Sequence, residues 1–419
     1  MPYIQVPDTS FDLFYRLSTP LRSNQATSIE EEYETILLFH PYWVDSFYFY
    51  PQFDDPSFNE NYNIIAFDAP AHGSTKAKGI SSEPVTWSYF ASIVKDALTI
   101  LKIPAVHVIG STMGCCAAMH FASKYPEITK TLTMSAPPAL EEATNWSLTF
   151  RECMHILINS VKTNDPEPLD AITSVIFDYN ATSHSSQVLK DLEEEYCQSI
   201  RSRLLRGELN GEMTVPILIS LALSRKHLLS LDEMVNLKPP VLIIQGTNEG
   251  WEASDDQWAK ILEESDQIHR QKYGKGLNIK RMVLDDLPRW MSLTCPETVN
   301  PIIKGFVRTG SSGDVSSLAE FEVDQSTSTD TTMRMISTTR RRLSINPPKP
   351  RLPFSRTDPI DVGPVRQETV GSDKPDLMAN KRFYSGSRHV NIPSNTRSGK
   401  NRSSSIDINV HVDVVTKVD

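Results

Sequence analysis

Three short apolar runs, each followed by a loop with unusual chemistry, constrain the fold of this chain most strongly. They cover residues 35–39, 62–67 and 105–109 and are rich in β-branched or aromatic side chains. Helix-like segments at 87–101 and 113–124 follow the second and third runs. Continuous apolar strands separated by helices are typical of a parallel sheet buried on both faces. The pattern predicts an α/β fold with a mostly parallel central sheet flanked by helices.

The remainder of the apolar region continues this pattern with one interruption. Further strands are expected as two short runs within 3–16 and at 131–134, 241–244 and 279–284, with helices at 255–268 and 296–307. Between about 139 and 235 the pattern is helical without strands, with amphipathic stretches at 148–161, 187–206 and 216–223. We therefore expect a core at 1–138 and 236–308 with a helical cap inserted at 139–235.

Charge and composition set the last quarter of the chain apart. The formal net charge is -10, but residues 1–308 carry 26 Lys and Arg against 39 Asp and Glu, whereas 309–419 carry 16 against 13. An acidic body argues against nucleic acid as a partner, because phosphate binding needs concentrated positive charge. The segment 309–419 is rich in Ser, Thr, Arg and Pro and cannot bury enough apolar surface to offset chain entropy. It is predicted to be a disordered tail.

Two short motifs in this tail suggest regulation. Arginines at 340–342 precede Ser344 at a spacing that basophilic kinases favour, and residues 347–353 are proline-rich enough for a polyproline helix that meets an SH3-like groove. Such motifs also occur by chance. A kinase acting on Ser344 and a protein partner for the proline-rich stretch therefore stay open beside a plain solvated linker.

The cysteines and the start of the chain bear on its compartment. Five cysteines are an odd number and lack metal-ligand spacing, as expected for reduced thiols. The first residues lack the pattern of a secretory signal, and no run of about 18 apolar residues occurs. We expect a cytoplasmic protein without a transmembrane segment, metal or cofactor.

The sequence GSTMG at 110–114 has the outline of a nucleophile elbow, a Gly-x-nucleophile-x-Gly turn between a strand and a helix. Its central residue is Thr112, where a serine would be expected. A threonine hydroxyl attacks in enzymes built for it. However, β-branching increases strain at such a turn and restricts the side chain. Shifting the register to Ser111 removes the flanking glycines and does not restore the motif.

The order of these motifs resembles the α/β-hydrolase superfamily, of the AB hydrolase type with a helical cap. The resemblance covers about residues 3–308. It rests on HPYW at 40–43, FDAPAHGS at 67–74, GSTMG at 110–114, VLIIQGTNE at 241–249 and the segment 284–301. These match, in order, the family's oxyanion loop, Gly-His-Gly loop, elbow, acid loop and the segment that carries the catalytic histidine.

The resemblance also shows two departures from an intact triad. Aligning the last segment on its Pro-Glu pair at 296–297 places Arg289 at the position of the family's histidine. Arginine stays protonated and cannot accept the nucleophile's proton. The acid position falls on Glu249, and a carboxylate facing a guanidinium forms an ion pair. We therefore expect Glu249 and Arg289 to bridge the old active site.

Other parts of the implied site are less altered. The resemblance assigns the two oxyanion donors to the backbone N–H groups of Tyr42 and Met113. It places His40 and His72 in loops that brace the site, and it counts His40 and Ser111 among the oxyanion and pocket residues. For both histidines a structural, hydrogen-bonded role is favoured over a catalytic one.

The sequence leaves two functions open. It therefore also leaves open whether the chain is an enzyme. The leading interpretation is a weakly active or inactive hydrolase that acts through a small-molecule ligand in a pocket under the cap, or through protein interaction. In that interpretation the chain, a hydrolase-like body without a complete triad followed by an Arg/Ser-rich tail, is similar in plan to the N-myc downstream-regulated family of non-catalytic proteins. The alternative is an active intracellular hydrolase of small esters or acyl compounds that uses Thr112 with a non-standard base.

Overall fold

The computed structural model describes seven stretches of the chain: residues 3–22, 26–81, 84–141, 144–181, 187–223, 230–247 and 252–310. Glu249, Ser344 and the proline-rich stretch lie outside them, as does the predicted tail beyond Gly310. Within these stretches no helix combines the length and the apolarity needed to cross a bilayer.

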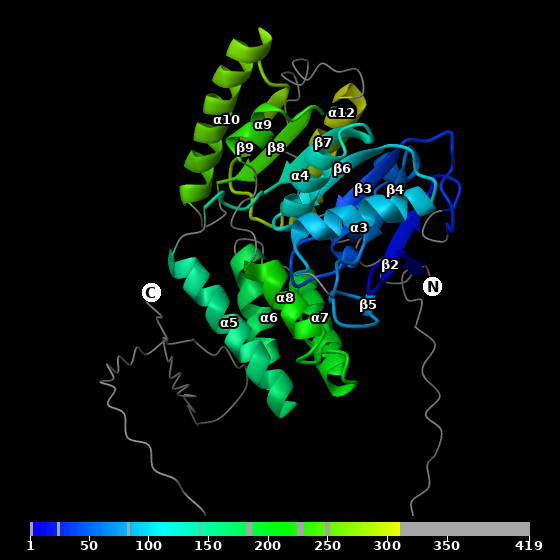
Figure 1. Cartoon of the computed structure of the whole chain (residues 1–419), viewed down its shortest axis with the longest axis vertical. Coiled ribbons are helices and arrows are strands. Elements are labelled where there is room, and N and C mark those ends of the chain that lie inside the picture. Colours follow the sequence, from blue (N-terminus) through cyan, green and yellow to red (C-terminus); the bar gives the residue numbers. More distant parts are fainter. Residues whose placement is uncertain are drawn as a thin grey trace, which may run out of the picture. The chain divides into compact units, whose positions relative to one another are not determined.

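A mixed sheet forms the centre of the described chain (Figure 1). Its order is β1-β2-β4-β3-β6-β7-β8-β9, with β5 beside β2. β2 runs antiparallel to its three neighbours, and the other five pairs are parallel. The strands are β1 (Tyr3–Gln5), β2 (Phe11–Ser18), β3 (Thr35–Phe39), β4 (Asn63–Phe67), β5 (Lys76–Ala77), β6 (Val106–Ser111), β7 (Thr129–Ser135), β8 (Val241–Gly246) and β9 (Ile279–Leu284). The predicted fold class is confirmed, and β5 is the strand that was not expected.

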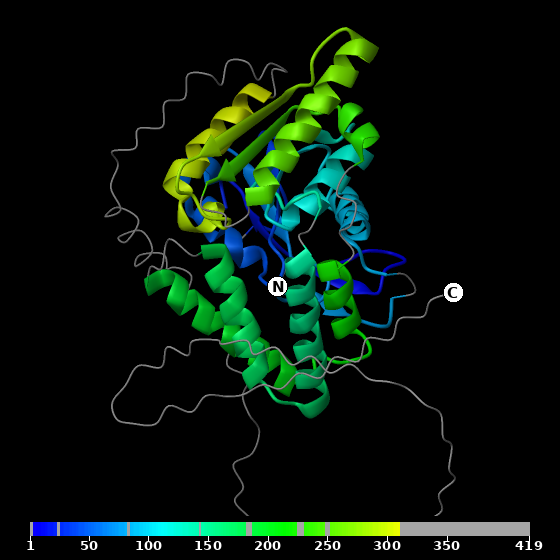
Figure 2. The ribbon, with the colours of Figure 1, turned by 90° about the vertical axis from the view of Figure 1, so that its left-hand side faces the viewer.

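Helices cover both faces of this sheet (Figures 1 and 2). Leu37 and Phe39 of β3 belong to the apolar cluster that includes α3 (Trp87–Ile100) and α4 (Gly114–Lys124), whereas Ile36 lies in the cluster on the opposite face. Successive strand residues point to opposite faces, so a strand covered on both sides needs an unbroken apolar run. That requirement explains why the strands could be located from sequence.

The remaining core helices complete the two layers. α10 (Glu252–Tyr273) contributes Trp258 to the cluster on the α3 and α4 side, and α12 (Pro296–Gly310) covers the other face. The shorter elements are η1 (Ser46–Phe49), α1 (Tyr50–Asp54), α2 (Pro56–Asn59), α9 (Leu231–Val235) and α11 (Met291–Thr294).

Five described helices lie between β7 and β8 in the chain, and the four long ones that precede the short α9 are here called the inserted helices. They are α5 (Thr144–Thr163), α6 (Glu167–Ala181), α7 (Gln187–Leu205) and α8 (Thr214–Leu223). The sequence predicted α5, α7 and α8 but missed α6. The division of the chain into a core and a separate cap domain stays a prediction.

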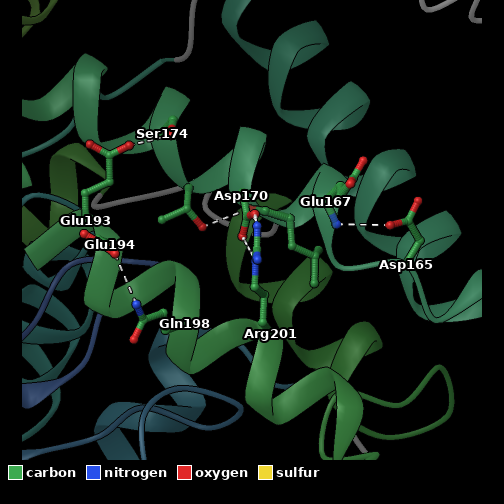
Figure 3. Close-up of polar contacts among 10 residues, drawn as sticks. Asp165, Glu167, Asp170, Ser174, Glu193, Glu194, Gln198 and Arg201 are labelled. Carbon is green, nitrogen blue, oxygen red and sulfur yellow. Dashed lines mark hydrogen bonds and ion pairs between the residues drawn. The ribbon is translucent and has the colours of Figure 1, made fainter. Parts of the chain in front are cut away.

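Polar contacts join α6 to α7 (Figure 3). Arg201 of α7 lies with its Nε 2.8 and 2.9 Å from the two carboxylate oxygens of Asp170 on α6. Ser174 of α6 donates to Glu193 of α7 nearby. These contacts are made inside the inserted helices and do not involve the sheet.

His107 places an ionisable group inside the sheet. It lies on β6 with its side chain buried, its Nδ1 2.9 Å from Thr131 Oγ1 and its Nε2 3.4 Å from a carboxylate oxygen of Glu34. Burial lowers the pKa of His107 to about 4, although the charge of Glu34 opposes this shift. The imidazole is therefore neutral in the folded protein at pH 7.

This buried imidazole predicts a loss of stability in acid. The unfolded chain binds a proton at His107 below about pH 6.5, whereas the folded chain binds one only near pH 4. The stabilisation is present above pH 6.5 and is lost as the pH falls toward 4. Its size is roughly 3 kcal/mol at 1.36 kcal/mol per pKa unit. Urea unfolding at pH 7, 5.5 and 4 measures the free energy of unfolding. This free energy should fall less between pH 7 and pH 4 for His107→Gln than for the unmodified protein. An equal fall in both proteins would contradict the prediction.

Candidate functional site

The turn between β6 and α4 has the geometry of a nucleophile elbow. Thr112 stands between the strand and the helix with φ 44°, in the left-handed region that β-branched residues rarely adopt. Its N–H donates to Ser135 O at 2.9 Å, and its carbonyl accepts from Cys115 N–H at 2.9 Å. The turn is thus held by main-chain hydrogen bonds to β7 and to α4, and its strain is retained although the residue is threonine.

Two glycines make this turn sterically feasible. A Cβ at Gly114 would lie 2.2 Å from Phe39 O and 2.6 Å from His40 O. A Cβ at Gly110 would lie 2.7 Å from the Cα of Cys115. The elbow therefore packs directly on the end of β3, where the predicted oxyanion loop begins.

The predicted oxyanion loop is strained and is fixed by the inserted helices. Trp43 has φ 76° and donates from Nε1 to Thr173 Oγ1 of α6 at 3.0 Å. Tyr42 is buried, and its hydroxyl donates to Leu218 O of α8 at 3.1 Å. Within the described ranges no hydrogen bond uses the N–H of Tyr42 or Met113. That is the condition expected of two donors kept for a ligand oxygen, although their assignment stays a prediction.

The side chain of Ser111 forms a hydrogen bond with Tyr48 and, in the part of the chain that the structure describes, none with the predicted oxyanion loop. Its hydroxyl lies 2.8 Å from Tyr48 Oη, and both side chains are fully buried. A related hydroxyl contact, from Ser292 to Ser135 at 3.0 Å, ties α11 to the end of β7. The predicted pocket residue Ser111 therefore belongs to a buried network that supports the turn.

His40 uses both ring nitrogens. Ala69 N–H donates to its Nε2 at 2.9 Å, so the proton resides on Nδ1, which donates to Pro41 O at 2.7 Å. Burial lowers the pKa of His40, although the charge of Asp68 opposes this shift. The ring is a neutral brace between two loops.

His72 differs from His40 at one nitrogen. Its Nδ1 lies 2.9 Å from Pro70 O and acts as the donor. Its Nε2 is buried and has no hydrogen-bond partner among the described residues. The ring packs edge-on against Tyr42, with centroids 5.2 Å apart, and burial lowers the pKa of His72 to about 3. His72 therefore presents a bare, neutral acceptor nitrogen next to the predicted oxyanion loop.

Arg289 is buried in the loop after β9, with 6 % of its surface exposed. The next residue, Trp290, donates its N–H to Asn180 O of α6 at 3.0 Å. This loop lies against the start of the acid loop, because Asp286 N–H donates to Thr247 Oγ1 at 2.8 Å. Glu249 itself falls outside the described residues, so its ion pair with Arg289 stays a prediction.

The inserted helices supply residues that sequence reasoning did not assign to the site. Phe150 and Met154 of α5 contact Tyr42, and Phe177 of α6 packs edge-on against Trp290 with centroids 4.8 Å apart. The amphipathic stretch predicted at 148–161 contains Phe150 and Met154 but did not show against what they pack, and Phe177 lies in the helix that was missed. In the described part of the chain no cluster of His, Cys, Asp and Glu has the arrangement of a metal site.

The close approach of Gly114 to β3 gives a test of the elbow. Gly114→Ala should lower the free energy of unfolding by about 3 kcal/mol or more, because its Cβ clashes with main-chain oxygens that cannot move away. Gly79→Ala is the matched control, since nothing lies within 4 Å of a Cβ there, and it should change stability by less than about 0.5 kcal/mol. Urea unfolding measures both, and equal effects would exclude the packing described here.

Comparisons with known proteins agree with this geometry. Residues 35–165 match the family model of the alpha/beta hydrolase fold. Among solved structures, the chain is similar to MGS-M2, an alpha/beta hydrolase from a Medee basin deep-sea metagenome library, with TM-score 0.55 and 16 % identity over 73 % of this chain and 97 % of that one. A thermophilic esterase from Thermogutta terrifontis gives TM-score 0.51 and 15 % identity, over 74 % of this chain and 99 % of the esterase. At such identities these likenesses show the fold.

Curated relatives match over short stretches. The probable lysophospholipase BODYGUARD 2 of Arabidopsis thaliana is 29 % identical over 97 residues, which are 23 % of this chain and 20 % of the relative. The 2-hydroxy-6-oxononadienedioate/2-hydroxy-6-oxononatrienedioate hydrolase of Comamonas testosteroni is 32 % identical over 85 residues, 20 % of this chain and 29 % of the relative. The chain thus spans less than a third of either relative's length.

Proposed function

We propose that this protein, a member of the α/β-hydrolase fold superfamily, has kept the scaffold of a hydrolase site but hydrolyses esters weakly or not at all, and acts by binding a small ligand there. The observation that carries the proposal is the strained elbow with Thr112 at its centre. The proposal also rests on the sequence alignment, which assigns Arg289 to the position of the base.

The two departures reinforce each other chemically. A hydroxyl nucleophile needs a partner that takes its proton, and a guanidinium cannot do so at neutral pH. Thr112 also holds its hydroxyl on a β-branched Cβ at φ 44°, where fewer rotamers are accessible. With base and serine both replaced, the remaining catalysis is that of the oxyanion hole and binding alone, on the order of a thousandfold or more below an intact triad.

Several features of the described residues support a binding site. Both elbow glycines are required, and the predicted oxyanion loop is fixed by contacts from α6 and α8. Side chains around that loop are mainly aromatic or apolar, as Trp43, Phe150 and Met154 illustrate. These features favour a small, largely apolar ligand whose carbonyl oxygen would meet the N–H groups of Tyr42 and Met113.

One observation favours the alternative of a working hydrolase. His72 Nε2 is an imidazole lone pair without a donor among the described residues, and its ring contacts Tyr42. A neutral imidazole is the usual general base for a hydroxyl nucleophile, but the pKa of about 3 makes His72 a much weaker base than an ordinary imidazole. In the alternative, His72 takes the proton of Thr112 during attack on a small ester, a substrate class consistent with the esterase and lysophospholipase names of the similar proteins.

Two further proposals concern the surroundings of the protein. All five cysteines are free, which supports a reducing compartment such as the cytoplasm. A kinase acting on Ser344, or a protein partner for the tail, is supported by the sequence motifs alone.

Hydrolysis of p-nitrophenyl acetate and p-nitrophenyl butyrate separates the two functions. We expect the unmodified protein and Thr112→Ala to release p-nitrophenol at the same low rate. Turnover well above that of a protein-free control, abolished by both Thr112→Ala and His72→Gln, would establish the alternative instead.

Restoring the triad residues tests the assignment of the positions themselves. The double variant Thr112→Ser with Arg289→His should gain turnover on the order of a hundredfold over the unmodified protein, because a positioned general base contributes that much or more. Each single substitution should gain little, since nucleophile and base act as a unit. A folded double variant with unchanged turnover would mean that Arg289 does not occupy the position of the base.

A further inference from the structure

Two side chains of helix α7, Arg203 and Tyr196, form hydrogen bonds with the loops that follow β4 and β3. Arg203 Nη2 donates to Ala71 O at 2.8 Å. Tyr196 Oη donates to Asp45 Oδ1 at 3.0 Å and accepts from Asp45 N–H at 3.2 Å. The two residues are seven positions apart on α7, which is about two helical turns, so they lie on one face of the helix. That face is fixed to the core at two points.

The two receiving points lie in the loops that build the candidate site. Ala71 has φ 63° and directly precedes His72. Asp45 follows the strained Trp43 by two residues. Each contact therefore acts on a short, strained segment in which a small displacement moves a residue of the site.

Asp68 connects these two loops beneath α7. Its carboxylate is fully buried and accepts from Ser46 N–H at 2.8 Å and from Ser74 N–H at 2.7 Å. A Cβ at Gly73 would lie 2.1 Å from Asp68 Oδ2 and 2.6 Å from the Cβ of Asp45. The two loops are thus packed together around one carboxylate, with a second nearby.

Arg203 supplies a positive charge to this buried cluster. Burial lowers the pKa of Arg203, and the charges of Glu208, Asp45 and Asp68 oppose that shift. Burial, followed by the charge of Asp45, raises the pKa of Asp68. The charges of Asp45 and Asp68 therefore favour a cation at the half-buried Arg203, whose guanidinium donates to Ala71 O.

We propose that Arg203 is a positioning residue that couples α7 to the loops at 40–46 and 68–74. While Arg203 holds Ala71 O, the two loops keep the shape that places Tyr42 and His72 at the elbow. Withdrawal of α7 releases both loops together, so the inserted helices control the site through its supporting loops. This inference goes beyond the proposed function and holds for a binding protein and for an enzyme alike.

Arg201 offers a matched control on the same helix. It pairs with Asp170 of α6 and so joins two inserted helices without reaching the core (Figure 3). Its side chain is 47 % exposed and that of Asp170 is 22 % exposed. Substituting Arg201 removes an equal charge from α7 and leaves the contact with Ala71 intact.

Hydrogen exchange of the full chain, followed by mass spectrometry, tests the coupling. In Arg203→Met, amides within 40–47 and 68–75 should exchange about tenfold faster or more, the factor expected from losing one charge-assisted hydrogen bond at a buried site. Amides of β6 and α3 should exchange as before. In Arg201→Met, both loops should exchange at the rate of the unmodified protein. Unchanged loops in Arg203→Met, or equal acceleration in Arg201→Met, would overturn the proposal.

Two further variants keep the test decisive if Arg203→Met does not fold. Arg203→Lys retains the charge but loses the planar set of guanidinium N–H donors. Exchange at 68–75 should become at least about threefold faster, a smaller acceleration than in Arg203→Met, which also loses the charge. Tyr196→Phe removes the other crossing contact and should accelerate exchange at 42–47. Exchange in both variants identical to that of the unmodified protein would show that α7 does not position these loops.

Discussion

The contact between Gly114 and the end of β3 is the constraint on which the site depends. Because a Cβ at this position would lie 2.2 Å from Phe39 O, the start of α4 and the loop after β3 can approach only when residue 114 is glycine. Two residues before this contact, Thr112 adopts the left-handed region with φ 44°. The scaffold therefore maintains the shape of the elbow independently of what Thr112 can do chemically. The packing that fixes the elbow does not depend on the chemistry of the side chain at position 112.

Strain is concentrated at the carboxyl ends of the parallel strands. Trp43, Ala71, Thr112 and Ala136 follow β3, β4, β6 and β7, and all four have positive φ without being glycine. Each such residue costs of the order of 1 to 3 kcal/mol and persists only where surrounding contacts determine it. Hydrogen bonds hold these residues in place. Trp43 bonds to Thr173 of an inserted helix, and the main-chain N–H of Thr112 bonds to Ser135 O. The same edge of the sheet thus carries the strain and the candidate site.

Sequence reasoning located the strands and the elbow because both depend on local rules. Strands buried on both faces must be continuously apolar, and a strand-to-helix turn this tight needs its glycines. Helix α6 was missed because its buried residues Leu169, Ile172 and Phe177 are interspersed with Asp170 and Thr173, which weakens its apolar face. Contacts such as Trp43 with Thr173 and Arg203 with Ala71 join residues 130 or more positions apart. No local pattern encodes such pairs, so the coupling of helices to loops became visible only in the structure.

Several contacts between the inserted helices and the core end on main-chain oxygens. Tyr42 donates to Leu218 O, Trp87 to Leu221 O and Trp290 N–H to Asn180 O. A carbonyl is present whatever side chain a residue carries, so these attachments do not depend on the identity of positions 218, 221 or 180. Substitutions at these three positions can therefore change the side chains that α6 and α8 present while these attachments stay in place. The contact of Trp43 with Thr173 differs, because it needs a hydroxyl on α6 and so limits what residue 173 can become.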